Sequence, residues 1–271
     1  MRLATVRIGG GTRAARLEGE SLAILEPSDV GELLAGDFPD SSSSEHLPLS
    51  QADWAPLVTR PPKIICLGHN YLAHIREVGA EIPSHPTLFA KYARALIGAR
   101  DPIVLPRTSE KVDWEVELAF VIGRTARHAA IHEASEAIAG YTILNDVSMR
   151  DYQYRTPQWL QGKMFEKSTP VGPVLVSPDE LRGAEDLVLR CEVDGKVMQE
   201  GRTSDLVFSP VEIVSYVSDI ITLEPGDLIS TGTPAGVGQG RKPPLYLKPG
   251  QTVRTTIEGI GELLNECVLE D

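Results

Sequence analysis

The stretch VDWEVELAFVIG, residues 112–123, decides how this chain is interpreted. It is apolar enough for a buried β-strand, yet Glu115 and Glu117 lie in its middle. The side chains of a strand point alternately to its two faces. The two glutamates therefore share one face with Asp113. The opposite face, which we expect to pack in the core, carries Trp114, Val116 and Leu118.

Two neighbouring carboxylates on a buried face repel each other, and each needs a compensating partner. That partner is either a pair of Lys or Arg side chains or a divalent cation. Oxygen ligands favour a hard cation such as Mg²⁺, Mn²⁺ or Ca²⁺ over zinc. Asp146 ends a second apolar strand, in YTILNDVS, and offers a third carboxylate. The alternative is a strand whose glutamates face solvent.

Composition narrows the class of protein. The 271 residues are 42% hydrophobic and 24% charged, which is typical of a globular protein with one large domain or two unequal ones. The net charge of -12 argues against nucleic acid as a partner, and an anionic substrate needs local positive charge. We find no signal peptide and no apolar run of membrane-spanning length, so we expect no membrane partner and a cytoplasmic location.

The cysteines do not form a pattern typical of a disulfide framework or a zinc site. Cys66, Cys191 and Cys267 are widely spaced, their number is odd, and no CxxC occurs. Each lies in an apolar stretch, so we expect small buried hydrophobic side chains.

Periodicity and turn residues predict a mostly β (α+β) chain with a few helices. Residues 1–35 predict short strands, a hairpin around Gly19 and a helix capped by Asp29. The Pro- and Ser-rich stretch 37–54 indicates a linker. We therefore expect a small N-terminal α/β domain with its linker at 1–58 and a larger domain at 59–271. Further predicted features are a helix ending at Gly79, a helix and then a strand over 131–148, a hairpin turn at 193–196 and a helix starting at Ser209–Pro210.

Three further sets of residues are candidates for chemistry. His74 and Glu77 are spaced i, i+3 on the predicted helix, where a carboxylate orients an imidazole as a general base. Lys163 is placed to neutralise an anion. The hydroxyls of Thr231 and Thr233, with nearby backbone N–H groups, are suited to hold a carboxylate. The alternatives are a surface pair, a solvated lysine and a plain turn between strands.

The order of the motifs is more specific than any one of them. The chain resembles the fumarylacetoacetate hydrolase family over about residues 62–260, through GHNYLAHIREVG, TLFAKY, VDWEVELAFVIG, NDVSMRD, GKMFEKSTPVGP and DLISTGTPAGVG. The resemblance implies a catalytic domain built on a rolled, barrel-like mixed β-sheet. It also implies a homodimer.

The resemblance assigns roles to residues of both strands and of the helix. It implies Mg²⁺ or Mn²⁺ held by Glu115, Glu117 and Asp146. It implies a catalytic dyad of His74 and Glu77, on a segment that orders over the substrate.

Other roles follow from the same resemblance. Lys163 is implied as a catalytic and substrate-binding residue, with Thr233 and Gln153 as further substrate contacts. His69 stands where relatives have an arginine, which puts one anion contact in doubt. Lys167 stands where relatives have a small hydroxyl residue, and we expect it to point to solvent.

The implied activity acts on a small anionic 2-oxo acid. We expect a hydrolase that cleaves the C3–C4 bond of a 2,4-diketo acid, of the acylpyruvate or fumarylpyruvate type, in aromatic compound catabolism. His74, helped by Glu77, would activate water, and the metal with Lys163 would stabilise the pyruvate enolate. The alternatives use the same enolate for oxaloacetate decarboxylation or for isomerisation of 2-hydroxyhepta-2,4-diene-1,7-dioate. A catalytically inactive binding protein is a third hypothesis.

Overall fold

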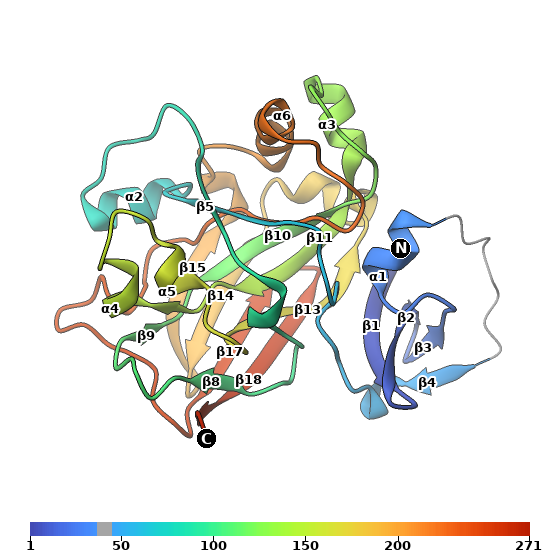
Figure 1. The fold of residues 1–271 in the computed structure, drawn as a ribbon, viewed down its shortest axis with the longest axis horizontal. Helices are drawn as coiled ribbons and strands as arrows, with labels where there is room; N and C mark the ends of the chain where they lie inside the picture. The colour runs from blue at the N-terminus through green and yellow to red at the C-terminus, as the bar shows by residue number, and fades with distance from the viewer. Residues whose placement is uncertain (37–44) are drawn as a thin grey trace.

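A computed structural model describes residues 1–36 and 45–271 of the protein, which is mostly β (Figure 1). An eleven-stranded sheet, called the large sheet below, dominates the structure. Its strands lie in the order β4 (His46–Pro48), β3 (Ser21–Ile24), β2 (Gly11–Glu18), β1 (Arg2–Ile8), β13 (Thr169–Val176), β11 (Ile138–Asn145), β10 (Val116–Ile122), β16 (Leu228–Ser230), β5 (Ile64–Gly68) and β6 (Thr87–Ala90), with β7 (Leu96–Ile97) paired to β13.

Two smaller sheets complete the β-structure. The five-stranded sheet has the order β15 (Lys196–Arg202), β14 (Val188–Val193), β17 (Thr252–Ile257), β18 (Gly261–Leu269) and β8 (Ile103–Leu105). The third sheet pairs β12 (Ser148–Met149) with β9 (Val112–Asp113). Parallel and antiparallel pairings both occur, so the expected mixed sheet is confirmed. Across the described residues, the large sheet runs between two ends and does not close into a barrel.

The helices are short. They are α1 (Val30–Ala35), α2 (Leu72–Val78), α3 (Ile131–Ala137), α4 (Arg150–Gln153), α5 (Leu160–Lys163) and α6 (Pro210–Ile220), with 3-10 turns η1 (Leu49–Gln51), η2 (Ala93–Ala95), η3 (Pro178–Ala184) and η4 (Thr203–Asp205). In the part of the chain that the structure describes, no helix is both long and apolar enough to cross a membrane.

The opening stretch lies at the centre of the large sheet, and its side chains alternate as the sequence predicts. All seven residues of β10 are buried. Trp114, Val116 and Leu118 pack in the main hydrophobic core, which includes residues of both larger sheets. Ala119 and Val121 point to the other side and pack in a second apolar cluster. The core face expected for this strand is therefore confirmed.

Local signals in the sequence also match the elements. Asp29 caps α1 by accepting a hydrogen bond from the backbone N–H of Glu32. The helix α2 ends at Gly79, whose φ of 68° is the left-handed conformation that glycine adopts without strain. Ser209 and Glu212 form a capping box at the start of α6. The three cysteines are buried and free, as expected.

The N-terminal strands continue the large sheet. Leu3 of β1 pairs with Leu175 of β13, and the hairpin predicted around Gly19 joins β2 to β3. Figure 1 shows these strands in blue as a group at one side of the molecule. Part of the predicted linker, 37–44, lies outside the described residues. The division of the chain at 58 and 59 stays a prediction.

Gly98 is a test of how closely the N-terminal segment packs. A Cβ atom at this position would overlap the backbone carbonyl of Trp54, and backbone cannot move aside as a flexible side chain can. We expect Gly98→Ala to lower the free energy of unfolding by about 3 kcal/mol, measured by urea denaturation. Gly11→Ala is the matched control, because a Cβ atom there meets no atom within 4 Å. Equal stability of the two variants would contradict this packing.

Candidate active site

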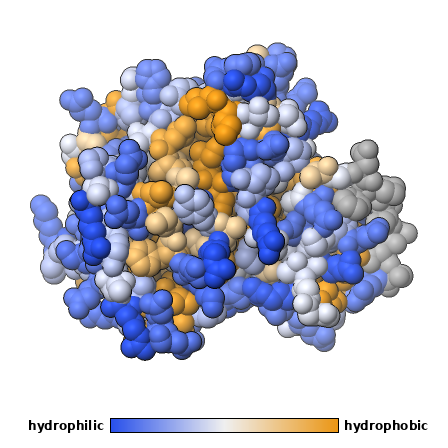
Figure 2. Space-filling model, viewed as in Figure 1, coloured by the Kyte–Doolittle hydropathy of each residue, from blue (hydrophilic) through white to orange (hydrophobic). Residues whose placement is uncertain are grey.

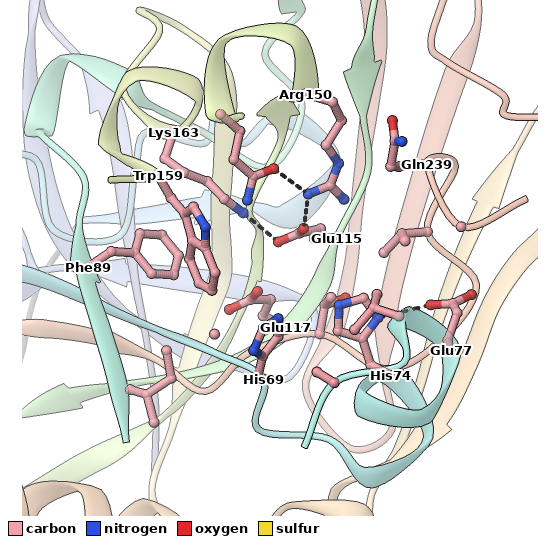
Figure 3. A pocket seen from close by; sticks show the side chains of 18 of the residues that line it. His69, His74, Glu77, Phe89, Glu115, Glu117, Arg150, Trp159, Lys163 and Gln239 are labelled. Carbon is pink, nitrogen blue, oxygen red and sulfur yellow. Dashed lines mark hydrogen bonds and ion pairs between the residues drawn. The ribbon is translucent and has the colours of Figure 1, made fainter. Parts of the chain in front are cut away.

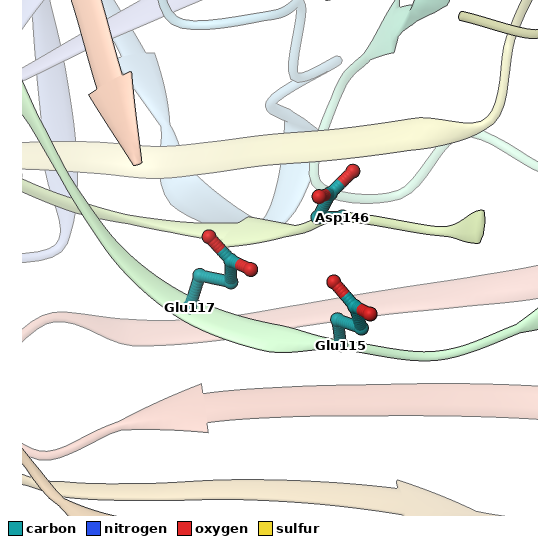
Figure 4. A group of neighbouring side chains, drawn as sticks. All are labelled: Glu115, Glu117 and Asp146. Carbon is teal, nitrogen blue, oxygen red and sulfur yellow. The ribbon is translucent and has the colours of Figure 1, made fainter. Parts of the chain in front are cut away.

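The pairing of β10 with β11 brings three carboxylates to one point. Val116 pairs with Asn145, and the backbone N–H of Asp146 donates to the carbonyl of Glu115 at 2.9 Å. Ligand oxygens of Glu115, Glu117 and Asp146 consequently lie within 4.8 Å of one another (Figure 4). All three residues are buried, so the alternative of a solvent-facing strand is wrong.

Cations compensate two of these carboxylates. Lys163 Nζ lies 2.7 Å from Glu115 Oε2 and 2.7 Å from Asp146 Oδ2. Lys91 Nζ lies 2.6 Å from Asp146 Oδ1, and Arg150 Nη1 lies 2.7 Å from Glu115 Oε1. Lys91, Arg150 and Lys163 are themselves buried. In the described part of the chain, Glu117 has no such cation; it accepts hydrogen bonds from Ser230 and Gly232 instead (the latter at 3.0 Å).

The pKa shifts follow this unequal compensation. Burial raises the pKa of a carboxyl group, but the charges of Lys163 and Arg150 outweigh it and lower the pKa of Glu115 to about 2. Burial also acts on Glu117, and the charges of Asp146 and Glu115 add to it, so the pKa of Glu117 is raised well above its ordinary value. Arg150 also pairs with a fourth buried carboxylate, that of Asp113, at 2.8 Å. Four ionised carboxylates against three cations leave the group one positive charge short. Three buried carboxylates with that deficit fit a hard divalent cation.

The loop after β16 holds Glu117. The Ser230 hydroxyl and the Gly232 N–H donate to its carboxylate, while the hydroxyls of Thr231 and Thr233 donate to the carbonyls of Leu118 and Val116, both at 2.9 Å. The hydroxyls of Thr231 and Thr233 were expected to hold a carboxylate, but they donate to backbone carbonyls. The carboxylate that the loop holds is that of Glu117, bound by Ser230 and Gly232. Thr233 still lines the cavity described below, and its substrate contact stays a prediction.

His74 and Glu77 face a cavity of about 480 Å³ that Glu115 and Glu117 also line (Figure 3). Glu77 Oε2 lies 2.9 Å from His74 Nδ1, and Glu77 Oε1 accepts from the backbone N–H of Gly236 at 2.9 Å. Glu77 therefore fixes the imidazole ring and leaves Nε2 as its free nitrogen. The two side chains are only 12% and 19% exposed, so this is not the plain surface pair considered above.

Lys163 and Gln153 reach the cavity from adjacent short helices, α5 and α4. Gln153 Oε1 accepts from Arg150 Nη1 at 2.8 Å. Close packing requires a glycine at position 162, before Lys163. A Cβ atom there would lie 2.6 Å from the backbone N and the Cβ of Gln153. The structure thus brings the expected catalytic and substrate-contacting residues to one cavity, while their roles stay predictions.

The two departures from the family pattern differ in position. His69 lines the cavity with a positive φ of 53°, an uncommon conformation for a residue other than glycine, and its ring lies 5.2 Å from that of Trp159. Burial, and then the neighbouring His74, lower the pKa of His69. Lys167 is exposed and does not line the cavity, as expected.

The sequence argument missed Lys91, Arg150 and Gln239. Lys91 follows the strand in TLFAKY and Arg150 lies in NDVSMRD, so both belonged to quoted motifs. The available signal was a charged residue inside a stretch that was otherwise read as buried. Gln239, which also lines the cavity, follows the TGTPAGVG motif and gave no such signal.

The chain matches known proteins over most of its length. A model of the fumarylacetoacetate (FAA) hydrolase C-terminal region matches residues 63–268. The chain belongs to the fumarylacetoacetate hydrolase family. A mitochondrial oxaloacetate tautomerase from Homo sapiens is 43% identical over 224 residues, which cover 82% of this chain and 71% of that protein.

Solved structures of family members share the whole fold. A fumarylacetoacetate hydrolase from Exiguobacterium antarcticum has a TM-score of 0.89 at 33% identity, with 100% of both chains covered. A 2-hydroxyhepta-2,4-diene-1,7-dioate isomerase from Mycobacterium marinum has a TM-score of 0.83 at 34% identity, covering 100% of this chain and 99% of that one. The family therefore includes proteins named for different reactions.

The lack of a cation beside Glu117 predicts how the stability of the metal-free protein depends on pH. A raised pKa in the folded state means that the metal-free protein loses stability as the pH rises from the ordinary carboxyl pKa through the raised value. In EDTA at pH 8, we expect Glu117→Gln to raise the Tm by about 2–6 °C, with a smaller gain at pH 5. Glu115→Gln is the control: it should lower the Tm, because it removes the partner of Lys163 and Arg150. The reverse order of Tm values would contradict the charge deficit.

Proposed function

We propose that this member of the fumarylacetoacetate hydrolase family is a divalent-metal-dependent enzyme that enolises a 2-oxo acid, with oxaloacetate as the first candidate substrate. One observation carries the proposal: the buried oxygens of Glu115, Glu117 and Asp146 lie within 4.8 Å of one another, in a site that shares its cavity with the His74–Glu77 dyad. The name of the human relative, an oxaloacetate tautomerase, supports the choice of substrate.

The three carboxylates would hold Mg²⁺ or Mn²⁺, which supplies positive charge for the 2-oxo acid head and for the enolate oxygen. The chain's own residues do the rest. Lys163 adds a second positive charge beside that head, since its Nζ lies between Glu115 and Asp146. Burial of these groups strengthens their electrostatic effect, because water does not screen them.

His74 is the residue proposed to move the proton. Its Nδ1 is engaged by Glu77, so its Nε2 is the nitrogen available in the cavity. In enolisation, His74 takes a proton from C3 of the 2-oxo acid, the C3–H electrons form the C2–C3 double bond, and the imidazolium then returns the proton to the C2 oxygen. No bond of the carbon skeleton breaks. Glu77 stabilises the imidazolium that forms and keeps the ring in this orientation.

Hydrolysis of a 2,4-diketo acid, the activity expected from the sequence, is the second candidate. The same free Nε2 favours it, because His74 would take a proton from a water molecule as that water attacks C4. The C3–C4 bond then breaks, its electrons form the pyruvate enolate, and a carboxylic acid leaves. The fumarylacetoacetate hydrolase with the same fold supports this candidate. Decarboxylation and isomerisation are further outcomes of the same enolate.

Side-by-side assays decide among these reactions. Oxaloacetate enolisation is followed by ultraviolet absorbance, its decarboxylation by pyruvate release, and hydrolysis with acetylpyruvate and fumarylpyruvate. The proposal expects enolisation of oxaloacetate to have the highest kcat/KM. Faster turnover of a diketo acid would favour the second candidate. Absence of all these activities in the metal-loaded protein would support the inactive binding protein instead.

Removal of the cation or of its ligands should abolish activity. We expect EDTA treatment to reduce turnover to background, and Mg²⁺ or Mn²⁺ to restore it. Asp146→Asn should lower kcat/KM at least about a hundredfold without unfolding, since the amide keeps the size of the side chain but donates poorly to a cation. Glu136→Gln, on the exposed side of α3, is the control. Unchanged activity after chelation would show that the metal assignment is wrong.

Substitution of His74 should affect the catalytic step and leave substrate binding nearly unchanged. We expect His74→Ala to lower kcat by about 10²- to 10⁴-fold, with KM changed only a few-fold, because the residue acts on a proton in the transition state. Steady-state kinetics with the best substrate measures both constants. His132→Ala, at an exposed position of α3, should leave them unchanged. A normal kcat in His74→Ala would remove the residue from the mechanism.

The homodimer expected from the sequence is also a proposal. Figure 2 shows apolar side chains gathered in a band on one face of the molecule, beginning beside α6. Ile220 and Ile221, at the end of α6, are 58% and 46% exposed. Apolar surface of this kind marks association between proteins. We expect sedimentation to give twice the mass of the chain.

The cytoplasmic location expected from the sequence stays a prediction as well.

A further inference from the structure

One side of the cavity carries hydrogen-bond donors that the mechanism above does not use. Asp113, which is fully buried, organises them: its Oδ2 accepts from Arg150 Nε at 2.8 Å and from the backbone N–H of Gln239 at 2.9 Å. Its Oδ1 accepts from the backbone N–H of Gly238 at 2.7 Å. Arg150 and Gln239 are therefore held beside each other, as Figure 3 shows.

Tyr246 fixes the Gln239 side chain in one orientation. The Tyr246 hydroxyl donates to Gln239 Oε1 at 2.6 Å. The amide NH₂ is then the free end of the side chain, and in the described part of the chain it has no hydrogen-bond acceptor. Gln239 is half-buried and lines the cavity. A glutamine held by its oxygen presents a donor and cannot turn its carbonyl to the same place.

The neighbouring guanidinium has a second unused donor. Arg150 is 4% exposed, and its Nη2 is buried with no partner among the described residues, while Nε and Nη1 are engaged by Asp113, Glu115 and Gln153. A buried charged donor without an acceptor is costly, so Nη2 needs an acceptor from outside the chain, either a water molecule or a group of a ligand that displaces it. Both residues line the cavity and both are held by Asp113, and a pair of such donors, one of them charged, suits a carboxylate.

We propose that Gln239, oriented by Tyr246, is a specificity-determining residue that selects substrates with a second carboxylate at the end remote from the 2-oxo acid head. The inference rests on the proposed function, because the head is placed at Glu115, Glu117 and Asp146. The donors of Gln239 and Arg150 are not needed there, since Lys163 and the cation already serve the head. They are free for the tail, and a tail that ends in a methyl group leaves both unpaired.

Equilibrium binding tests this without any turnover. The ligands are two matched pairs, 2-oxoglutarate with 2-oxopentanoate and 2-oxoadipate with 2-oxohexanoate, in which a methyl group replaces the terminal carboxylate. Oxalate serves as a ligand with the head alone. Calorimetry with the Mg²⁺-loaded protein should show a preference of about tenfold or more for the dicarboxylate in at least one pair, the range of a hydrogen bond to a charged group.

Variants of Gln239 and Tyr246 test whether these residues cause the preference for the dicarboxylate. Gln239→Leu should abolish it while leaving the affinity for oxalate within twofold, and Tyr246→Phe should reduce it about threefold, because the amide is then free to rotate. Gln51→Leu, at an exposed position of η1, is the control and should behave as the wild type.

The outcomes separate the two proposals. Retention of the full preference in Gln239→Leu, or its absence from the wild type in both pairs, overturns the role of Gln239 alone. A preference in Tyr246→Phe equal to that of the wild type overturns the orienting role of Tyr246. Failure of oxalate to bind the Mg²⁺-loaded wild type overturns the proposed function, and the inference falls with it. Normal binding without turnover contradicts only the proposed reaction.

Discussion

The burial of three carboxylates at one point of the large sheet is the constraint on which the rest of the site depends. Like charges at this separation repel strongly where water is excluded. Lys163 bridges two of the carboxylates, Lys91 contacts Asp146, and Glu117 is left to hydrogen-bond donors. The arrangement leaves a deficit of positive charge. That deficit is the physical basis of the proposed cation and, once the cation is bound, of the proposed anionic substrate in a protein of net charge -12.

Alternation was the most informative signal in the sequence. It gave the core face of β10 and the shared face of Glu115 and Glu117, because the period of two is a property of the strand itself. Helix ends were equally accessible, since Asp29, Gly79 and Ser209 act within one turn of their own positions. The grouping of Asp146 with the glutamates came from the resemblance to a family, whereas its basis is the register of β10 against β11.

Contacts between segments distant in the chain were beyond the sequence argument. Lys91 and Arg150 reach the cluster from segments distant in the sequence, and no local rule places either of them there. The partner of the TGTP loop was also beyond the sequence argument. The N–H groups of this loop and the hydroxyls of Thr231 and Thr233 suggested an anion site. The loop does hold an anion, Glu117, but through Ser230 and Gly232, which the pairing of β10 with β16 brings beside it. The two threonine hydroxyls donate to backbone carbonyls instead.

The position of Asp113 has a consequence for how members of such a family diverge. Asp113 fixes the loop that carries Gln239, and Glu115, two residues along the same segment, belongs to the carboxylate cluster. On the proposal that Gln239 contacts the tail of the substrate, this short stretch of backbone sets the distance between the two ends of the bound substrate. Exchange of the Gln239 side chain would then alter the preference for the tail while the carboxylate cluster stays in place.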